Sequence, residues 1–134
     1  MIQVLLIEDE ESIRRVMSRI LKEENHQYEI TEAVDGKQGL DLLFKRQFDL
    51  VLCDIKMPKM DGIEVLKKAN DEMLNIPFIM LTGHGNIETA VVAMKLGAYD
   101  FISKPPDLNR LLNSVRHALE NKSLRSENTI LKNK

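Results

Sequence analysis

The stretch LVLCDIKMPKMDG, residues 50–62, decides how this chain is predicted to fold. Its four apolar residues lead directly to Asp54, and a loop marked by Pro58 and Gly62 follows. A short apolar run bounded by Pro and Gly is typical of a fully buried strand. Asp54 is therefore predicted at the C-terminal tip of a strand, where open α/β sheets bind their ligands.

The same pattern recurs along the whole chain. Short apolar runs predict strands at 4–7, 28–33, 50–54, 76–81 and 99–103, and helical spacings predict helices at 12–24, 39–44, 63–69, 87–96 and 108–119. This alternation favours parallel strands joined by helical crossovers, with helices on both faces of the sheet. We predict a flavodoxin-like α/β fold with strand order 2-1-3-4-5, the more polar 28–33 strand forming an edge.

Two details of the first helix are also predicted. Ser12 is expected to cap its N-terminus. The apolar residues after it recur at the spacing of one helical face: Ile13, Val16, Met17, Ile20 and Leu21.

Composition narrows the class of protein. The 134 residues fit one domain, and 43% hydrophobic with 30% charged residues is typical of a folded globular chain. A net charge of −2 argues against direct binding to nucleic acid. The single cysteine, Cys53, excludes an internal disulfide and falls in a buried run, which favours an inert thiol. Without a signal-like or membrane-spanning segment, we expect a cytoplasmic location.

Polar residues follow four of the five predicted strands. Glu8 and Asp9 follow the first, Asp54 ends the third, Thr82 follows the fourth and Lys104 the fifth. In a parallel sheet all strands end on the same side, so these residues converge at one end of the sheet. The second strand is followed by no residue of obvious chemical use. The contributing strands are adjacent in the predicted order, with the switch point between Asp9 and Asp54.

The chemistry of this set favours a phosphoryl group and Mg²⁺. Three carboxylates repel one another unless a cation or protons relieve them, and oxygen ligands suit a hard divalent ion. Lys104 and Thr82 are suited to phosphoryl oxygens. Asp54 is the candidate nucleophile, because a carboxylate can form an acyl phosphate.

These residues together resemble a known family. Glu8-Asp9, Asp54 within DIKMPKMDG, Thr82-Gly83 and Lys104-Pro105 are similar to the receiver domain of bacterial two-component response regulators, over residues 1 to about 120. The resemblance implies a CheY-like switch in which a sensor histidine kinase phosphorylates Asp54, and which catalyses only its own phosphorylation and dephosphorylation.

The resemblance also implies a role for each position. Asp9 would be a direct Mg²⁺ ligand with Asp54 and the main-chain carbonyl of Lys56, while Glu8 would help to organise the ion. Thr82 and Lys104 would hold the phosphoryl oxygens, and Lys104-Pro105 would be a cis peptide. Phe101 falls at the family's switch aromatic. Lys56 and His84 stand at positions that tune the phosphate lifetime, although both could simply be exposed loop residues.

The stretch GHGNIETAVVAMKLGAYDFISKP, residues 83–105, resembles receivers of the nitrogen-regulator (NtrC) class. Those receivers precede an ATPase that activates sigma-54 polymerase and a DNA-binding domain. Residues 121–134 are expected to begin a helical linker truncated before such an output domain, although a free-standing receiver is an alternative. The resemblance further implies a phosphorylation-sensitive homodimer through the fourth helix, fifth strand and fifth helix.

Two other functions share parts of this pattern. A Mg²⁺-dependent phosphohydrolase also forms an aspartyl phosphate, but it typically carries a second acid two residues after the nucleophile, where this chain has Lys56. A flavodoxin-like flavin protein needs a first loop rich in Ser, Thr and Gly, whereas residues 8–11 are four carboxylates that would repel the cofactor.

Overall fold

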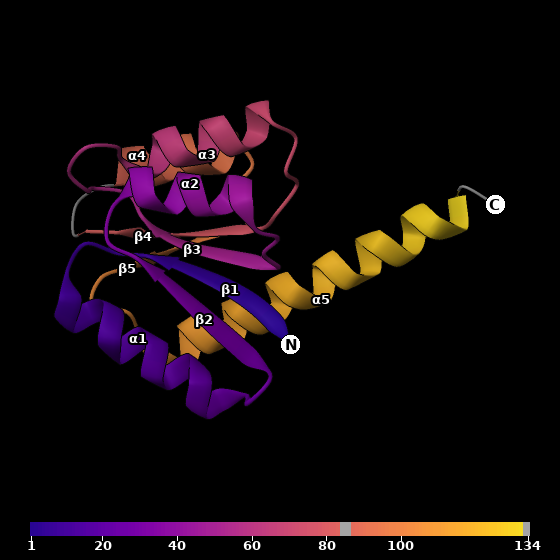
Figure 1. Cartoon of the computed structure of the whole chain (residues 1–134), viewed down its shortest axis with the longest axis horizontal. Coiled ribbons are helices and arrows are strands. Elements are labelled where there is room, and N and C mark those ends of the chain that lie inside the picture. The colour runs from indigo at the N-terminus through magenta and orange to yellow at the C-terminus, as the bar shows by residue number, and fades with distance from the viewer. Residues whose placement is uncertain (84–86, 133–134) are drawn as a thin grey trace.

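The computed structural model describes residues 1–83 and 87–132, with side chains described as far as Glu120. Strands and helices alternate along this part of the chain (Figure 1). The strands are β1 (Ile2–Ile7), β2 (Tyr28–Ala33), β3 (Leu50–Asp54), β4 (Phe78–Thr82) and β5 (Asp100–Ser103). The helices are α1 (Glu11–Glu24), α2 (Gly36–Lys45), α3 (Gly62–Asp71), α4 (Ile87–Lys95) and α5 (Leu108–Lys132).

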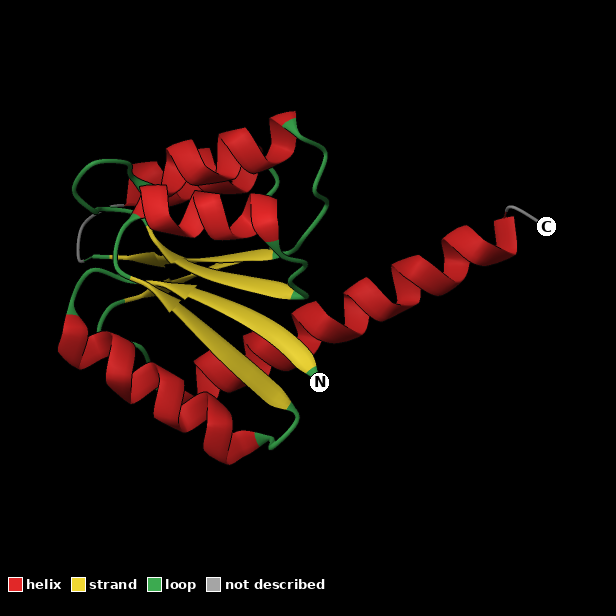
Figure 2. Cartoon of the chain, in the orientation of Figure 1, coloured by secondary structure: helices red, strands yellow, loops and turns green. Residues whose placement is uncertain are grey.

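The strands form one parallel sheet in the order β2-β1-β3-β4-β5, which confirms the predicted topology. Figure 2 shows α1 and α5 on one face of this sheet and the other three helices on the opposite face. β2 lies at an edge, as its more polar sequence predicts. Pairing of β3 with β1 and β4 places Asp54 beside Leu81 at the end of the sheet where the strands finish.

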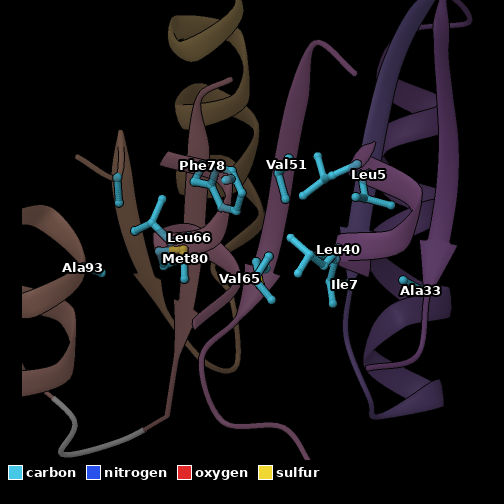
Figure 3. Close-up of a cluster of buried hydrophobic side chains, with 14 of the residues drawn as sticks. Leu5, Ile7, Ala33, Leu40, Val51, Val65, Leu66, Phe78, Met80 and Ala93 are labelled. Atoms are coloured by element: carbon cyan, nitrogen blue, oxygen red, sulfur yellow. The ribbon is translucent and has the colours of Figure 1, made fainter. Parts of the chain in front are cut away.

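Each face of the sheet has its own core, because successive residues of a strand point to opposite faces. Leu5, Val51 and Phe78 pack beneath the helices α2, α3 and α4, as Figure 3 shows. Their strand neighbours Leu6 and Leu52 pack against α1 and α5. Burial on both faces explains why the central strands are continuously apolar.

The first helix differs from the prediction in two respects. Glu10 is its N-cap, with no capping hydrogen bond from the side chain, so the expectation that Ser12 caps the helix is wrong. The Glu10 carbonyl already accepts the first helical bond, from the N–H of Arg14 at 2.9 Å, which leaves Ser12 inside the first turn. Val16 is 54% exposed, because the buried side of α1 is centred on Met17 and Leu21.

The fourth helix packs on the sheet through small residues. Ala90 and Ala93 are its buried positions, whereas Ile87, Val91, Val92 and Met94 are all exposed. The helix ends at Lys95, and Gly97 takes a φ of +97°, the left-handed conformation that glycine tolerates after a helix. The four larger apolar side chains of α4 are therefore exposed, together with Glu88 and Lys95.

The last helix extends beyond the sheet. It packs through Leu111, Val115 and Ala118 on the core that it shares with α1. It then runs on as one helix to Lys132 and leaves the body of the protein beyond the end of the sheet at which the strands begin (Figure 1). Among the described helices, none has the length and apolar character that crossing a membrane requires.

Candidate functional site

Four of the predicted site residues lie together where the strands end. Glu8 directly follows β1, Asp54 and Thr82 are the last residues of β3 and β4, and Lys104 directly follows β5. The N–H of Lys104 donates to the carbonyl of Thr82 at 2.7 Å, which holds the lysine beside the end of β4. The sheet register therefore fixes the starting point of each side chain.

The Lys104 ammonium bridges the two buried carboxylates. Its Nζ lies 2.6 Å from Glu8 Oε1 and 2.9 Å from Asp54 Oδ2, and 3.9 Å from Glu10 Oε1. Glu8 is fully buried, and Asp54 is 4% exposed. Buried charges of this kind need a partner, because water no longer solvates them.

Burial and charge shift the acid–base behaviour of all three groups. Burial raises the pKa of Glu8 to about 7, although its contact with Lys104 and the N–H of Glu10 oppose the shift. Burial likewise raises the pKa of Asp54, again opposed by Lys104. For Lys104, burial lowers the pKa, but the hydrogen bonds and negative charges of Glu8 and Asp54 outweigh it and the net shift is upward. Lys104 therefore stays protonated, while Glu8 and Asp54 keep their protons to higher pH than free carboxyl groups do.

The carboxylates also form a candidate metal site. Glu8, Asp9 and Asp54 each offer a ligand atom, and these atoms lie within 4.8 Å of one another. Apart from its ion pair with Lys104, the buried Oε1 of Glu8 accepts no hydrogen bond from the described residues. Asp9 is exposed, so a cation could reach the cluster from solvent. An all-oxygen donor set with open access fits Mg²⁺.

A close backbone approach holds the end of β3. The N–H of Gly62 donates to the carbonyl of Ile55 at 2.7 Å, and a Cβ on Gly62 would lie 2.4 Å from the carbonyl oxygen of Asp54. Asp61 caps α3 by accepting from the N–H of Glu64 at 2.9 Å. Asp61-Gly62 is thus a turn and helix start, and a side chain at position 62 would collide with the backbone of Asp54.

The remaining predicted residues are placed as follows. Thr82 is buried and Lys56 exposed, while Phe101 is half-buried against the core under α2, α3 and α4. The Lys104–Pro105 peptide bond is cis, as the resemblance implies. His84 lies outside the described residues.

Two contacts at the site were not predicted from the sequence. Glu10 approaches Lys104, and the run of four carboxylates could have suggested this. Arg14 donates from Nη1 to the main-chain carbonyl of Glu8 at 2.9 Å. No local motif signals that contact, because it depends on how α1 packs beside β1.

Cys53 is fully buried and burial raises the pKa of its thiol, which agrees with an inert core cysteine.

Comparison with known proteins identifies the class. Residues 4–116 match the family model for the response regulator receiver domain. The chain therefore belongs to the receiver domain family, and the resemblance stated from the sequence is confirmed.

Individual relatives define the branch of this family. The chain is 38% identical over 136 residues to a putative NtrX-like response regulator of Rickettsia bellii, covering 100% of this chain and 28% of that protein. It is 36% identical to the regulatory protein AtoC of Escherichia coli, covering 93% and 27%. The chain thus spans less than a third of the length of these relatives. Such relatives agree with the nitrogen-regulator class, and neither is named as a phosphohydrolase.

Solved structures agree with the sequence relatives. The crystal structure of NtrX from Brucella abortus superposes with a TM-score of 0.89 at 36% identity, covering 98% of this chain and 30% of that one. A receiver domain from Clostridium thermocellum gives a TM-score of 0.85 at 29% identity, covering 92% and 98%. The chain shares the fold of a part of a longer protein and of a receiver domain solved alone.

Proposed function

We propose that Asp54 accepts a phosphoryl group from a sensor histidine kinase in a Mg²⁺-dependent reaction. One observation carries the proposal: Lys104, whose side chain is 13% exposed, bridges Asp54 and Glu8, and these two carboxylates lie with Asp9 close enough to share a cation. Phosphoryl transfer needs mainly positioning and neutralisation of charge, and this set of groups supplies both.

The metal would be held by Asp9, Asp54 and the main-chain carbonyl of Lys56, with Glu8 organising the site. When bound, Mg²⁺ would neutralise negative charge on the phosphoryl oxygens. The buried Oε1 of Glu8 supports this assignment, because apart from its ion pair with Lys104 it accepts no hydrogen bond from the described residues and can still accept one.

In the transfer step an Asp54 carboxylate oxygen forms a bond to phosphorus. The phosphorus–nitrogen bond of the kinase phosphohistidine breaks, and its electron pair stays on the imidazole nitrogen. Lys104 and Thr82 would hold the phosphoryl oxygens, since Lys104 Nζ already lies 2.9 Å from Asp54 Oδ2. The domain would catalyse only its own phosphorylation and dephosphorylation, with Lys56 and His84 tuning the latter.

Phosphorylation would then shift a two-state equilibrium through Thr82 and Phe101. The exposed apolar side of α4 supports a homodimer through α4, β5 and α5, because contiguous exposed apolar groups mark interaction surfaces. Residues 121–134 would link the receiver to an ATPase and a DNA-binding domain in a cytoplasmic regulator of transcription. The length of the relatives and the continuous α5 support this part of the proposal.

Intact mass spectrometry after incubation with acetyl phosphate and Mg²⁺ tests the acceptor. We expect one added phosphate, lost in EDTA and in Asp54→Asn. If no adduct forms and beryllofluoride does not bind either, the acceptor assignment is wrong.

Sedimentation tests the dimer: an unchanged mass with and without beryllofluoride would contradict phosphorylation-sensitive pairing.

The tuning role is tested by the decay of the phosphorylated protein. Lys56→Ala and His84→Ala should each change the dephosphorylation rate severalfold. If both decay like the unsubstituted protein, these side chains are only exposed loop residues.

A further inference from the structure

Arg14 joins the acidic loop after β1 to the edge strand of the sheet. Its Nη1 donates to the main-chain carbonyl of Glu8 at 2.9 Å, and its Nε donates to Glu32 Oε1 at 3.2 Å. The Arg14 side chain is 13% exposed, whereas that of Glu32 is 37% exposed, so the guanidinium is largely buried and its partner lies at the surface. Glu32 belongs to β2, the strand whose sequence shows no obvious contribution to the site.

The contact completes the fixation of Glu8. The N–H of Glu8 donates to the carbonyl of Ala33 in β2 at 3.0 Å, and Glu8 Oε2 accepts from the N–H of Glu10 at 3.1 Å. Arg14 holds the one remaining main-chain group, the carbonyl. Glu8 therefore presents Oε1 to Lys104 from a backbone that is held at both ends.

The carbonyl of Glu8 belongs to the peptide plane that leads to Asp9. Because a peptide unit is planar, holding that oxygen also fixes the direction in which the Asp9 N–H and Cα lie. Asp9 itself is exposed. Holding the preceding carbonyl therefore helps to keep the Asp9 carboxylate close to those of Glu8 and Asp54, with which it forms the candidate metal site.

We infer that Arg14 is a positioning residue for the metal-binding loop, and that Glu32 of β2 holds Arg14 in place. The inference rests on the proposed function, because it assumes that Glu8, Asp9 and Asp54 bind Mg²⁺. It assigns the second strand a part in the site through two side chains, neither of which touches the metal or the phosphoryl group.

The charge of Arg14 and its positioning role predict opposite changes in Mg²⁺ affinity when the residue is removed, so the inference can be tested. A guanidinium near a cation repels it, so removing Arg14 would strengthen Mg²⁺ binding if only its charge mattered. If Arg14 acts by holding the loop, removing it weakens binding. Loss of a group that orients a metal ligand typically lowers metal affinity by about 10-fold to 100-fold.

Calorimetric titration of the unphosphorylated chain with Mg²⁺ alone distinguishes the two effects. We expect Arg14→Met to bind Mg²⁺ about 10-fold more weakly than the unsubstituted protein. Arg15→Met is the matched control, because Arg15 is the next residue of α1, is 75% exposed, and among the described residues pairs only with Glu11 across the helix surface. It removes the same charge and should leave the affinity unchanged. Equal or tighter binding by Arg14→Met would overturn the inference.

Two milder variants keep the test decisive if Arg14→Met does not fold. Arg14→Lys keeps the charge but cannot donate to both partners from one planar group, and Glu32→Gln keeps an acceptor while removing the ion pair. Each should weaken Mg²⁺ binding, by less than Arg14→Met does, while circular dichroism stays unchanged. Affinity equal to the unsubstituted protein in both would refute the inference.

The outcomes separate this inference from the function on which it rests. If the unsubstituted chain binds Mg²⁺ and takes up phosphate on Asp54 while Arg14→Met behaves identically, only the positioning role fails. If the unsubstituted chain binds no Mg²⁺, the proposed function fails and the inference fails with it.

Discussion

Lys104→Met is predicted to destabilise the metal-free protein severely. Among the described residues, Lys104 has the only ammonium group that lies within 3 Å of both Glu8 and Asp54, and the substitution removes it. Methionine fills a similar volume, so the main change is the loss of charge. Removing one partner of a buried ion pair typically costs about 3–5 kcal/mol, because the other charge is left unpaired. Against a total stability of about 5–15 kcal/mol, this is a large fraction.

The loss should depend on pH in a defined direction. Burial already raises the pKa of Glu8 to about 7 with the lysine present. Without it, both carboxyl groups would take up protons more readily, which relieves the repulsion at low pH. The difference from the unsubstituted protein should therefore be largest near pH 8 and smaller near pH 6.

Urea unfolding in EDTA measures this difference. Lys59→Met is the control, because Lys59 is 70% exposed and lies 3.6 Å from Asp35, a surface pair that should contribute about 1 kcal/mol at most. Mg²⁺ should restore part of the stability of Lys104→Met by supplying a replacement cation. A loss below about 1 kcal/mol in EDTA at pH 8 would refute the reasoning that Lys104 compensates the buried carboxylates.

Three further substitutions follow from the same geometry. In EDTA, folded Glu8 keeps until about pH 7 a proton that the unfolded chain loses near 4.5, so the unfolding free energy should fall by up to about 3 kcal/mol across that range. Urea titrations should show a flatter profile for Glu8→Gln, and a flat profile for the unsubstituted protein would contradict the raised pKa. Gly62→Ala places a methyl 2.4 Å from the Asp54 carbonyl, and thermal unfolding should show a loss of about 1–3 kcal/mol together with slower phosphorylation. Gly36→Ala meets the Met60 carbonyl at 2.1 Å and should destabilise by a similar amount, and unchanged melting in either alanine variant would show that these backbones move apart easily.

Much of the fold could be predicted because its signals are local. The apolar run that ends at Asp54 is buried on both faces, so its limits coincide with β3, and β2 likewise has its predicted limits. Because the predicted strands are parallel, the polar residues at their C-terminal ends were expected together at one end of the sheet. Since the family motif consists of those same strand ends, the candidate acceptor, the metal ligands and Lys104 were predicted together.

What could not be predicted depends on contacts between distant segments. The start of α1 is set by the Glu10 carbonyl, which makes the capping propensity of Ser12 irrelevant. Val16 has the right spacing for a buried position, but the contact of α1 with the sheet is centred one residue later. Arg14 joins a loop to β2 only because the helix between them packs as it does, and nothing local in the sequence reports that packing.

The position of Lys104 connects the acceptor to the helix that leaves the domain. Lys104 holds both buried carboxylates and stands between β5 and the start of α5. Asp100 of β5 accepts from Ser114 at 2.8 Å and pairs with Arg110 at 3.2 Å, and Arg110 also donates to the Phe101 carbonyl, so α5 is fastened to β5 along its first turns. A phosphoryl group that draws Lys104 away from Glu8 is therefore expected to act on β5 and α5 as a unit. Because α5 continues as one helix beyond the opposite end of the sheet (Figure 1), we propose that a change at Asp54 is transmitted out of the domain along this helix.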